Sequence, residues 1–347
     1  MEMDLNTLWF LLIAVLWIGY FFLEGFDFGV GILLPFLGKD DLDRRVLVNT
    51  IGPMWDGNEV WLIVAGGATF AAFPEWYATL FSGFYLPLLL ILVALIFRGV
   101  AFEFRGKDQR RQWRAWWDRA IFFGSALPAL LWGVAFANIV RGVKIDVIRG
   151  YHEYTGSLFD LLNPYALFAG VTTLVLFTLH GAVFLTLKTA GEIRERARRT
   201  AGMLTLPTAG LGLGFLIWTW LNVAAVDIDG TDVAAGSLSV AIALAAVAVI
   251  LLVRRGLEGW AFLGTGLMVV MVTLALFLYL YPEVMPTRLA GGEALDIYNA
   301  AATPKTLRVM TVVAAVFMPL VVAYQGWTYW VFRKRISRET FQAVDAA

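Results

Sequence analysis

Cysteine is absent from this chain of 347 residues, which excludes disulfide bonds and thiolate-bound iron–sulfur centres. Charge is also scarce, because 16% of the residues are charged, against about 25% in soluble domains. The 27 basic residues balance the 27 acidic ones, so nothing indicates a nucleic-acid partner. Histidine is limited to His152 and His180, which are too few to build several haem sites.

Apolar residues are what the chain has in abundance, at 60% of its length. A soluble fold would expose part of this excess to water, whereas a bilayer hides it. The apolar stretches are continuous rather than alternating, which predicts an all-α integral membrane protein and argues against a barrel. We expect one polytopic domain over 1–347 with short loops. Its nine predicted spans cover roughly 7–37, 55–73, 78–102, 118–140, 164–188, 201–224, 236–254, 258–281 and 306–332.

The distribution of basic residues predicts the orientation. The first apolar stretch follows Glu2 and Asp4 and lacks a small-residue cleavage site, which is typical of a span and not of a signal peptide. Lysine and arginine concentrate in cytoplasmic loops, so an extracytoplasmic N-terminus and a cytoplasmic C-terminus fit best. That arrangement leaves six of the 27 basic residues outside, namely Arg141, Lys144, Arg149, Arg288, Lys305 and Arg308.

Two acidic residues lie deep in the first predicted span. A charged side chain in the hydrocarbon costs several kcal/mol (about 3 on insertion scales), so its presence suggests a function. Glu24 and Asp27 are three residues apart, which places both carboxylates on one helix face. The surrounding glycines would let another helix approach closely. The simpler interpretation is an ion pair with a basic residue of a neighbouring helix.

A second acidic motif, Trp55-Asp56-Gly-Asn58-Glu59, opens the second predicted span. One interpretation is an ordinary helix start, since acidic side chains favour the positive end of a helix. The alternative is an acidic site that passes protons into the membrane from the cytoplasm, because a carboxyl group in an apolar setting can exchange a proton near neutral pH.

The third group lies at the inner end of the third predicted span. Arg98 precedes Glu103 and Lys107, which have the favourable order for an i,i+4 pair, and Asp118 follows at the start of the next span. These side chains form either a solvated inner surface or the cytoplasmic mouth of a proton route.

His180 lies in the middle of the fifth predicted span, beside Gly181. A membrane histidine can ligate haem or relay protons. Haem ligation needs a second ligand or a dedicated pocket, and His152 falls on an outer loop. We therefore expect a structural hydrogen bond at His180.

Several of these segments together resemble subunit II of cytochrome bd quinol oxidases. The Trp-Asp-Gly-Asn-Glu block is the most specific of them, and the run from Gly19 to Gly31 agrees as well. The match extends over essentially the whole chain. Other matching segments are 71–74, 81–85, 97–98, 103–105, 133–136, 162–164, 170–171, 281–286 and 329–330.

The resemblance implies a heterodimer in the prokaryotic cell membrane. In that family, subunit I carries the b-type haems and the d-type haem, and subunit II binds no haem directly. The complex oxidises quinol at the outer face and reduces dioxygen to water with cytoplasmic protons. Small accessory subunits, membrane lipid and quinone are further expected partners. Some relatives hold a structural quinone in subunit II, and the sequence does not locate its pocket.

The resemblance also implies residue roles. Asp56 corresponds to a residue on the family's proposed proton path toward the oxygen-reducing haem. Glu103 keeps a carboxylate where a relative has aspartate, and Lys107 and Asp118 fit the entry of that path. His180 stands where that relative has glutamine, which argues against an essential role. Glu24 and Asp27 are further candidates for the proton path, although the sequence does not show whether they titrate. The other motif residues are Trp55, Asn58, Glu59 and Arg98.

Two other functions fit parts of the sequence. A proton-coupled secondary transporter would also need membrane carboxylates and glycine-broken helices, but the chain shows no internal repeat. A purely structural subunit would shield subunit I and take no part in proton transfer.

Overall fold

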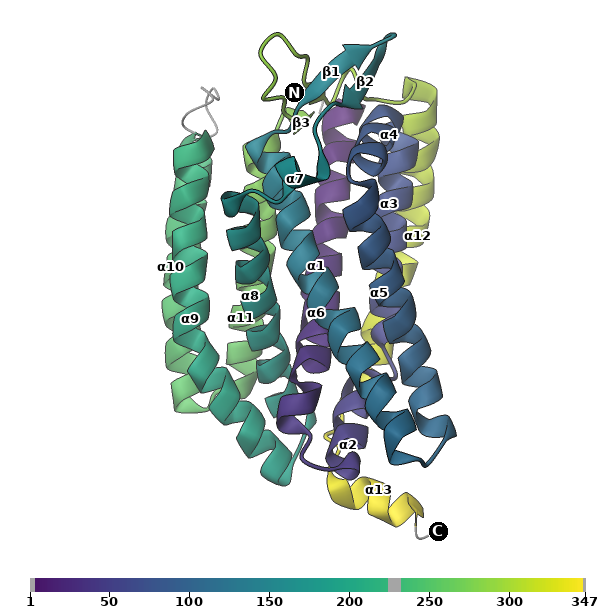
Figure 1. Cartoon of the computed structure of the whole chain (residues 1–347), viewed down its shortest axis with the longest axis vertical. Helices are drawn as coiled ribbons and strands as arrows, with labels where there is room; N and C mark the ends of the chain where they lie inside the picture. Colours follow the sequence, from purple (N-terminus) through teal and green to yellow (C-terminus); the bar gives the residue numbers. More distant parts are fainter. Residues whose placement is uncertain (1–3, 224–231, 346–347) are drawn as a thin grey trace.

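The computed structural model describes residues 4–223 and 232–345 as a bundle of long, roughly parallel helices (Figure 1). Eight of the described helices are long and apolar enough to cross a membrane, which confirms an all-α membrane architecture. They are α1 (Leu5–Leu37), α5 (Tyr85–Phe104), α6 (Arg111–Arg141), α8 (Pro164–Lys188), α9 (Gly191–Val223), α10 (Asp232–Arg255), α11 (Glu258–Leu280) and α12 (Pro304–Val331).

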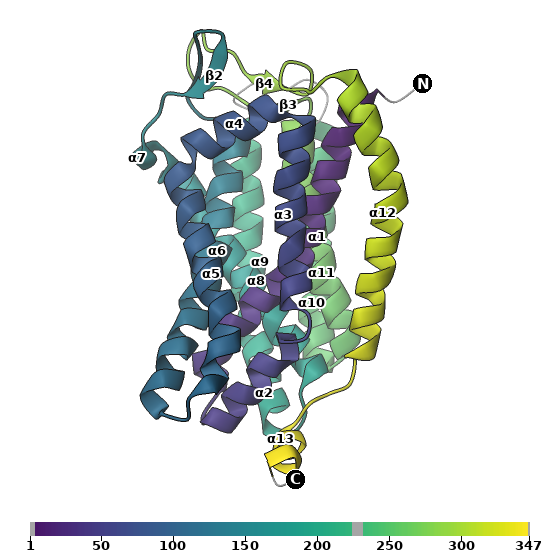
Figure 2. The same cartoon turned by 90° about the vertical axis from the view of Figure 1, so that its right-hand side faces the viewer.

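The second predicted span is also a helix, α3 (Trp55–Ala72), although it is not among those eight. It runs beside α1 in the upper part of the bundle as drawn in Figure 2, with α2 (Asp41–Ile51) below it. Two acidic residues in its first two turns lower its apolar character. Its 18 residues would extend about 27 Å at 1.5 Å per residue.

Several helices have other bounds than the predicted spans. The span expected over 78–102 is two helices, α4 (Pro74–Gly83) and α5, which are separated at Phe84. Pro87 has no N–H to donate to the Gly83 carbonyl, so a continuous helix would lose that bond. Helices α6 and α9 begin at 111 and 191, well before 118 and 201, because helices can extend beyond the apolar region. The predicted end at 224 lies outside the described residues.

Short elements occupy the connections that were expected to be loops. The segment 38–54 contains the helix α2, and the tail forms α13 (Arg338–Asp345). The end of the bundle that holds α2 and α13 is called its inner end, and the opposite end its outer end. The outer connections carry two small antiparallel ribbons and one helical turn (Figure 1). These elements are β1 (Ile145–Ile148), β2 (Tyr151–Tyr154), α7 (Leu158–Leu161), β3 (Glu283–Met285) and β4 (Leu295–Asp296), and η1 (Arg105–Lys107) follows α5 on the inner side.

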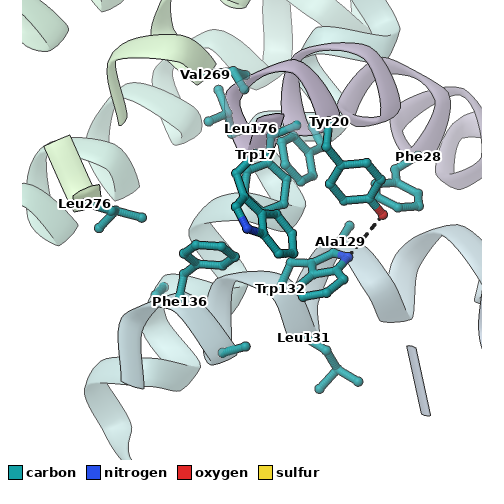
Figure 3. Close-up of a cluster of buried hydrophobic side chains, with 14 of the residues drawn as sticks. Trp17, Tyr20, Phe28, Ala129, Leu131, Trp132, Phe136, Leu176, Val269 and Leu276 are labelled. Atoms are coloured by element: carbon teal, nitrogen blue, oxygen red, sulfur yellow. Dashed lines mark hydrogen bonds between the residues drawn. The ribbon is translucent and has the colours of Figure 1, made fainter. Parts of the chain in front are cut away.

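Aromatic side chains fill the contact between α1 and α6. The ring centroids of Trp17 and Trp132 are 5.0 Å apart, and those of Trp17 and Phe136 are 4.8 Å apart (Figure 3). The Trp132 Nε1 donates to the Tyr20 hydroxyl at 3.2 Å, so a polar group within this cluster is satisfied. Aromatic pairs in this edge-to-face geometry stabilise the contact beyond the burial of their apolar area.

Glycines bring α1 and α8 into backbone contact. A Cβ atom built on Gly29 would lie 2.7 Å from the Gly181 Cα, and one built on Gly181 would lie 2.6 Å from the Val30 nitrogen. No side chain fits between these two helices at this level. The close approach fixes where α8, which carries His180, lies against α1.

Helix α12 packs differently from the rest of the bundle. Within the described residues it contacts α1 and α3, and Leu307 is its one fully buried residue. The segment after it returns across the inner end of the bundle, where the Ile336 nitrogen donates to the Lys188 carbonyl at 2.9 Å. Arg335 then pairs with Glu258 at 3.0 Å, and Arg338 with Asp43 at 2.6 Å.

Candidate functional site

The inner half of the bundle contains a fully buried ion pair between helices α1 and α5. Glu24 and Arg98 are both 0% exposed and lie in direct contact. The guanidinium carbon of Arg98 also lies 4.8 Å from the centre of the Phe28 ring and 5.6 Å from that of Phe102. For Glu24 the structure therefore shows the simpler of the two interpretations, an ion pair with a basic residue of a neighbouring helix.

Asn58 of α3 links the second acidic residue of α1 to α12. Its Nδ2 donates to the Asp27 Oδ2 at 2.7 Å. Its Oδ1 accepts from the Gln325 Nε2 at 2.9 Å and from the Tyr329 hydroxyl at 2.7 Å. The Trp61 Nε1 in turn donates to the Gln325 Oε1 at 3.0 Å. Three helices are thus joined by hydrogen bonds around one amide.

The resulting cluster contains more carboxyl groups than cations. Glu24, Asp27 and Glu59 all interact electrostatically with Arg98. Among the described residues, Glu24 Oε2, Asp27 Oδ1 and Glu59 Oε2 are buried atoms without a hydrogen-bond partner. Buried polar atoms without partners are uncommon in native structures and often mark functional sites. The arrangement can hold and exchange protons.

The surface-exposed acid Asp56 lies one helical turn before Glu59. Asp56 belongs to the first turn of α3, and its charge acts on Glu59. Trp55 packs on Phe102 with ring centroids 5.1 Å apart, which holds the start of α3 beside the end of α5. Asp56 therefore stands at the exposed edge of the buried cluster.

Glu103 and Lys107 are exposed at the end of α5 and in η1. In the described part of the chain neither takes part in an ion pair, so the predicted i,i+4 pair was wrong. The α-helix ends at Phe104, and the tighter 3₁₀ turn over 105–107 changes the spacing on which such a pair depends.

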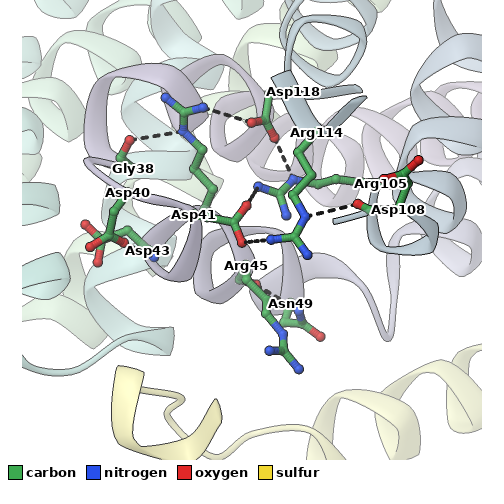
Figure 4. A network of polar contacts seen from close by, with 11 residues as sticks. Gly38, Asp40, Asp41, Asp43, Arg45, Asn49, Arg105, Asp108, Arg114 and Asp118 are labelled. Carbon is green, nitrogen blue, oxygen red and sulfur yellow. Dashed lines mark hydrogen bonds and ion pairs between the residues drawn. The ribbon is translucent and has the colours of Figure 1, made fainter. Parts of the chain in front are cut away.

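Asp118 is buried in a separate ionic network at the inner end of the bundle (Figure 4). It accepts from the Arg44 Nη1 at 2.9 Å and from the Arg105 Nε at 2.6 Å. Arg105 also pairs with Asp41 at 2.9 Å, and Arg114 contacts the same carboxylate. Two arginines therefore fix Asp118, and the structure does not bring it together with Asp56.

Charged groups outside the spans are held by their neighbours. A hydrogen bond from the backbone N–H of Asp43 lowers the pKa of Asp40, and a hydrogen bond from the Arg338 side chain lowers it further. In the outer connection, a hydrogen bond from Lys144 lowers the pKa of Asp160. These contacts stabilise the ends of the bundle and show no arrangement suited to proton transfer across it.

His180 lies away from the acidic cluster and both its ring nitrogens have partners. Nδ1 lies 2.8 Å from the Thr265 Oγ1, and Nε2 lies 3.2 Å from the Phe22 carbonyl oxygen. The ring stacks on Phe262 with centroids 4.8 Å apart. The expected structural hydrogen bond is confirmed. Within residues 4–223 and 232–345, no group of three His, Asp or Glu residues is arranged to hold a metal ion.

Sequence reasoning missed Gln325 as a member of the site. An amide in the middle of an otherwise apolar span is a usable signal, because polar groups in the bilayer need partners. Its position four residues before Tyr329 places both side chains on one face of α12.

The comparisons with known proteins agree with one another. A family model described as cytochrome bd terminal oxidase subunit II matches residues 5–332. The chain is 42% identical to the cytochrome bd ubiquinol oxidase subunit 2 of Bacillus subtilis, over 97% of this chain and 98% of that protein. It is 37% identical to the cytochrome bd-I ubiquinol oxidase subunit 2 of Escherichia coli K12, over 97% of each.

A solved structure supports the fold. A chain of the bd oxidase from Geobacillus thermodenitrificans superimposes with a TM-score of 0.75 at 18% identity, covering 95% of this chain and 99% of that one.

Proposed function

The chain belongs to the cytochrome bd terminal oxidase subunit II family, and from that premise we propose that it forms the haem-free half of a quinol oxidase and passes cytoplasmic protons toward its partner. The protein is a multi-pass component of the prokaryotic plasma membrane, and catalysis belongs to the complex with subunit I. The b- and d-type haems of that subunit would supply the electron transfer and oxygen chemistry. This family assignment replaces the transporter interpretation.

The observation that carries the proton-transfer proposal is the position of Asp56. It is exposed at the start of α3, its charge acts on Glu59, and Glu59 interacts with Arg98 of the buried cluster. Glu103 and Lys107 are exposed on the neighbouring helix end, where cytoplasmic water would reach them. We assign the entry of protons from the cytoplasm to Glu103 and Lys107, and their transfer into the cluster to Asp56. The three buried carboxyl groups would store protons, namely Glu59, Glu24 and Asp27. Asp118 would act by holding the inner helix ends in place.

Substitution of Asp56 by asparagine tests this assignment. We expect the assembled complex to reduce oxygen about 100-fold more slowly, because a positioned proton-transfer group contributes about 10²–10⁴-fold. Asp56→Glu should restore most of the rate, since it keeps the carboxylate. The measurement is oxygen consumption by purified complex with intact haem absorbance.

Asp108→Asn provides the matched control. Asp108 is a partly exposed inner carboxylate that pairs with Arg110 at 2.6 Å, away from the cluster. Its loss should leave the rate unchanged. An assembled Asp56→Asn complex with the wild-type rate would favour the purely structural subunit.

We propose nine spans, with α3 as the ninth. Its length suits a bilayer crossing, and polar residues at its inner end have partners in α1 and α12. The two described ends of the chain lie at opposite ends of the bundle (Figure 1), which supports an odd number of crossings. The N-terminus would be extracytoplasmic and the C-terminus cytoplasmic.

We further propose that subunit I packs against α12 and α3. Helix α12 is the least buried of the long helices, and exposed side chains such as Val316 and Leu320 face away from the bundle. Asp56 lies near this surface, so a proton leaving it would enter the partner. Lipid and any accessory subunits would cover the remaining apolar surfaces.

Single cysteines test both the topology and the partner surface, because the wild-type chain contains none. Lys305→Cys should react with an impermeant maleimide from outside, and Ser337→Cys only after the membrane is opened.

A benzophenone maleimide on Leu320→Cys should crosslink to subunit I. Leu244→Cys on α10 is the control, because it is 66% exposed, close to the 62% of Leu320, and should not crosslink. The reverse crosslinking pattern would refute the proposed surface.

A structural quinone would fit an apolar groove in the outer half of the bundle. The groove has a volume of about 540 Å³ and lies between α3, α4 and α5, where Gly66 and Gly67 leave open space. Trp76 lines it, and the Trp76 Nε1 is a buried donor without a partner among the described residues. A purified, active complex containing well under one quinone per chain would contradict this assignment.

A further inference from the structure

A second pocket, unrelated to the acidic cluster, opens at the inner end of the bundle. It has a volume of about 880 Å³ and lies between the ends of α1, α2 and α6. Five basic and three acidic residues line it, so its walls carry excess positive charge. They are Lys39, Arg44, Arg111, Arg114 and Arg119, with Asp40, Asp41 and Asp118.

The three acidic residues are already neutralised by arginines. Asp118 pairs with Arg44 and Arg105 at 2.9 and 2.6 Å. Asp41 pairs with Arg105 at 2.9 Å and also contacts Arg114. Asp40 pairs with Arg338 at 2.8 Å. No carboxylate of the pocket remains to balance a further cation.

Three cations of the pocket have no such partner. Within residues 4–223 and 232–345, Lys39, Arg111 and Arg119 form no ion pair, and all three are exposed. The guanidinium carbon of Arg119 lies 5.1 Å from the centre of the Trp116 ring, which keeps it beside the helix surface. Exposed cations around a concave site are suited to a bound anion.

Apolar side chains border the same pocket on its membrane side. Phe36 of α1 and Phe122 of α6 line it, with ring centroids 6.1 Å apart, and Phe36 is 70% exposed. The neighbouring Phe123 is 63% exposed. At the end of membrane helices, cations can bind the headgroup of an anionic lipid while neighbouring exposed aromatic side chains contact its acyl chains.

We propose that this pocket binds the phosphate headgroup of an anionic phospholipid of the inner leaflet, with its acyl chains against Phe36 and Phe122. Lys39, Arg111 and Arg119 supply the positive charge, and the Arg44–Asp118–Arg105 network holds the pocket walls. The inference requires the membrane topology proposed above but not the proton route, so it can fail while the role of Asp56 stands.

The test titrates the delipidated, purified complex with dioctanoyl phosphatidylglycerol and counts bound lipids by native mass spectrometry. We expect tighter binding than for dioctanoyl phosphatidylcholine. The triple variant Lys39→Gln, Arg111→Gln, Arg119→Gln should bind phosphatidylglycerol about 100-fold more weakly, because each basic residue near an anionic surface contributes about five-fold.

A matched triple variant separates this pocket from general surface charge. Arg199→Gln, Arg254→Gln and Arg255→Gln remove the same charge from exposed positions at the same end of the bundle, and this variant should bind like the wild type. Equal losses in both triple variants, or no preference over phosphatidylcholine, would overturn the proposal. Displacement of the lipid by equimolar inorganic phosphate would overturn it too, because the ligand would then be a free anion.

Discussion

Replacing Arg98 with methionine should destabilise the assembled complex by roughly 3–5 kcal/mol, because removing one partner of a buried ion pair leaves an uncompensated charge. Arg98 and Glu24 are both 0% exposed. Arg98 is also the cation that interacts with Asp27 and Glu59, so its loss leaves three carboxyl groups together. We expect a lower thermal transition and a poor yield of complex with intact haem absorbance.

The double variant Arg98→Met, Glu24→Gln separates charge from packing. It should recover much of the lost stability, because a buried pair replaced by neutral groups of similar volume is often tolerated. Arg110→Met is the control, since Arg110 pairs with Asp108 on the exposed surface and its loss should not change the transition. A double variant no more stable than Arg98→Met alone would show that the Arg98 side chain acts through its shape rather than its charge.

Gly181→Ala should destabilise the bundle by about 3 kcal/mol, near the upper end for added volume in a packed interior. The new Cβ would meet the backbone of Gly29 and Val30, and backbone atoms cannot rotate away as side chains do. Helices α1 and α8 would have to separate. The measurement is the thermal transition of the purified complex.

Gly210→Ala on α9 is the matched control for that substitution. A Cβ atom there meets nothing within 4 Å, so the methyl group has space. Alanine is favoured over glycine in a helix interior by roughly 0.5–1 kcal/mol, so the control should be neutral or slightly stabilising. Equal effects at Gly181 and Gly210 would mean that the helix contact tolerates separation.

The sequence predicted the long helices well because membrane thickness sets their length, but it placed some ends poorly. Helices α6 and α9 continue past the hydrocarbon into charged segments, where apolar periodicity no longer marks them. Helix α2 is short and polar, so hydropathy could not detect it. The division at Phe84 depends on one missing backbone donor at Pro87, which a window average does not register.

Most members of the candidate site were predictable from the sequence, but their contacts were not. Glu24, Asp27 and Arg98 were identifiable because charge is rare inside a span. The site is built from four helices, and no sequence spacing relates Asn58 to Gln325, which are 267 residues apart. Glu103 and Lys107 show the opposite error, because a local spacing rule predicted a contact that the helix end removes.

The contact between α12 and Asn58 has a consequence for how the protein is made. Helix α12 follows α1 and α3 in the sequence, so the ribosome delivers Gln325 and Tyr329 after the other members of the site have been synthesised. Until then, the side-chain oxygen of Asn58 (Oδ1) lacks both of the hydrogen-bond donors that it has in the folded protein. The nascent chain therefore carries an incomplete polar centre through most of its synthesis, and the last of the long helices to be made completes it.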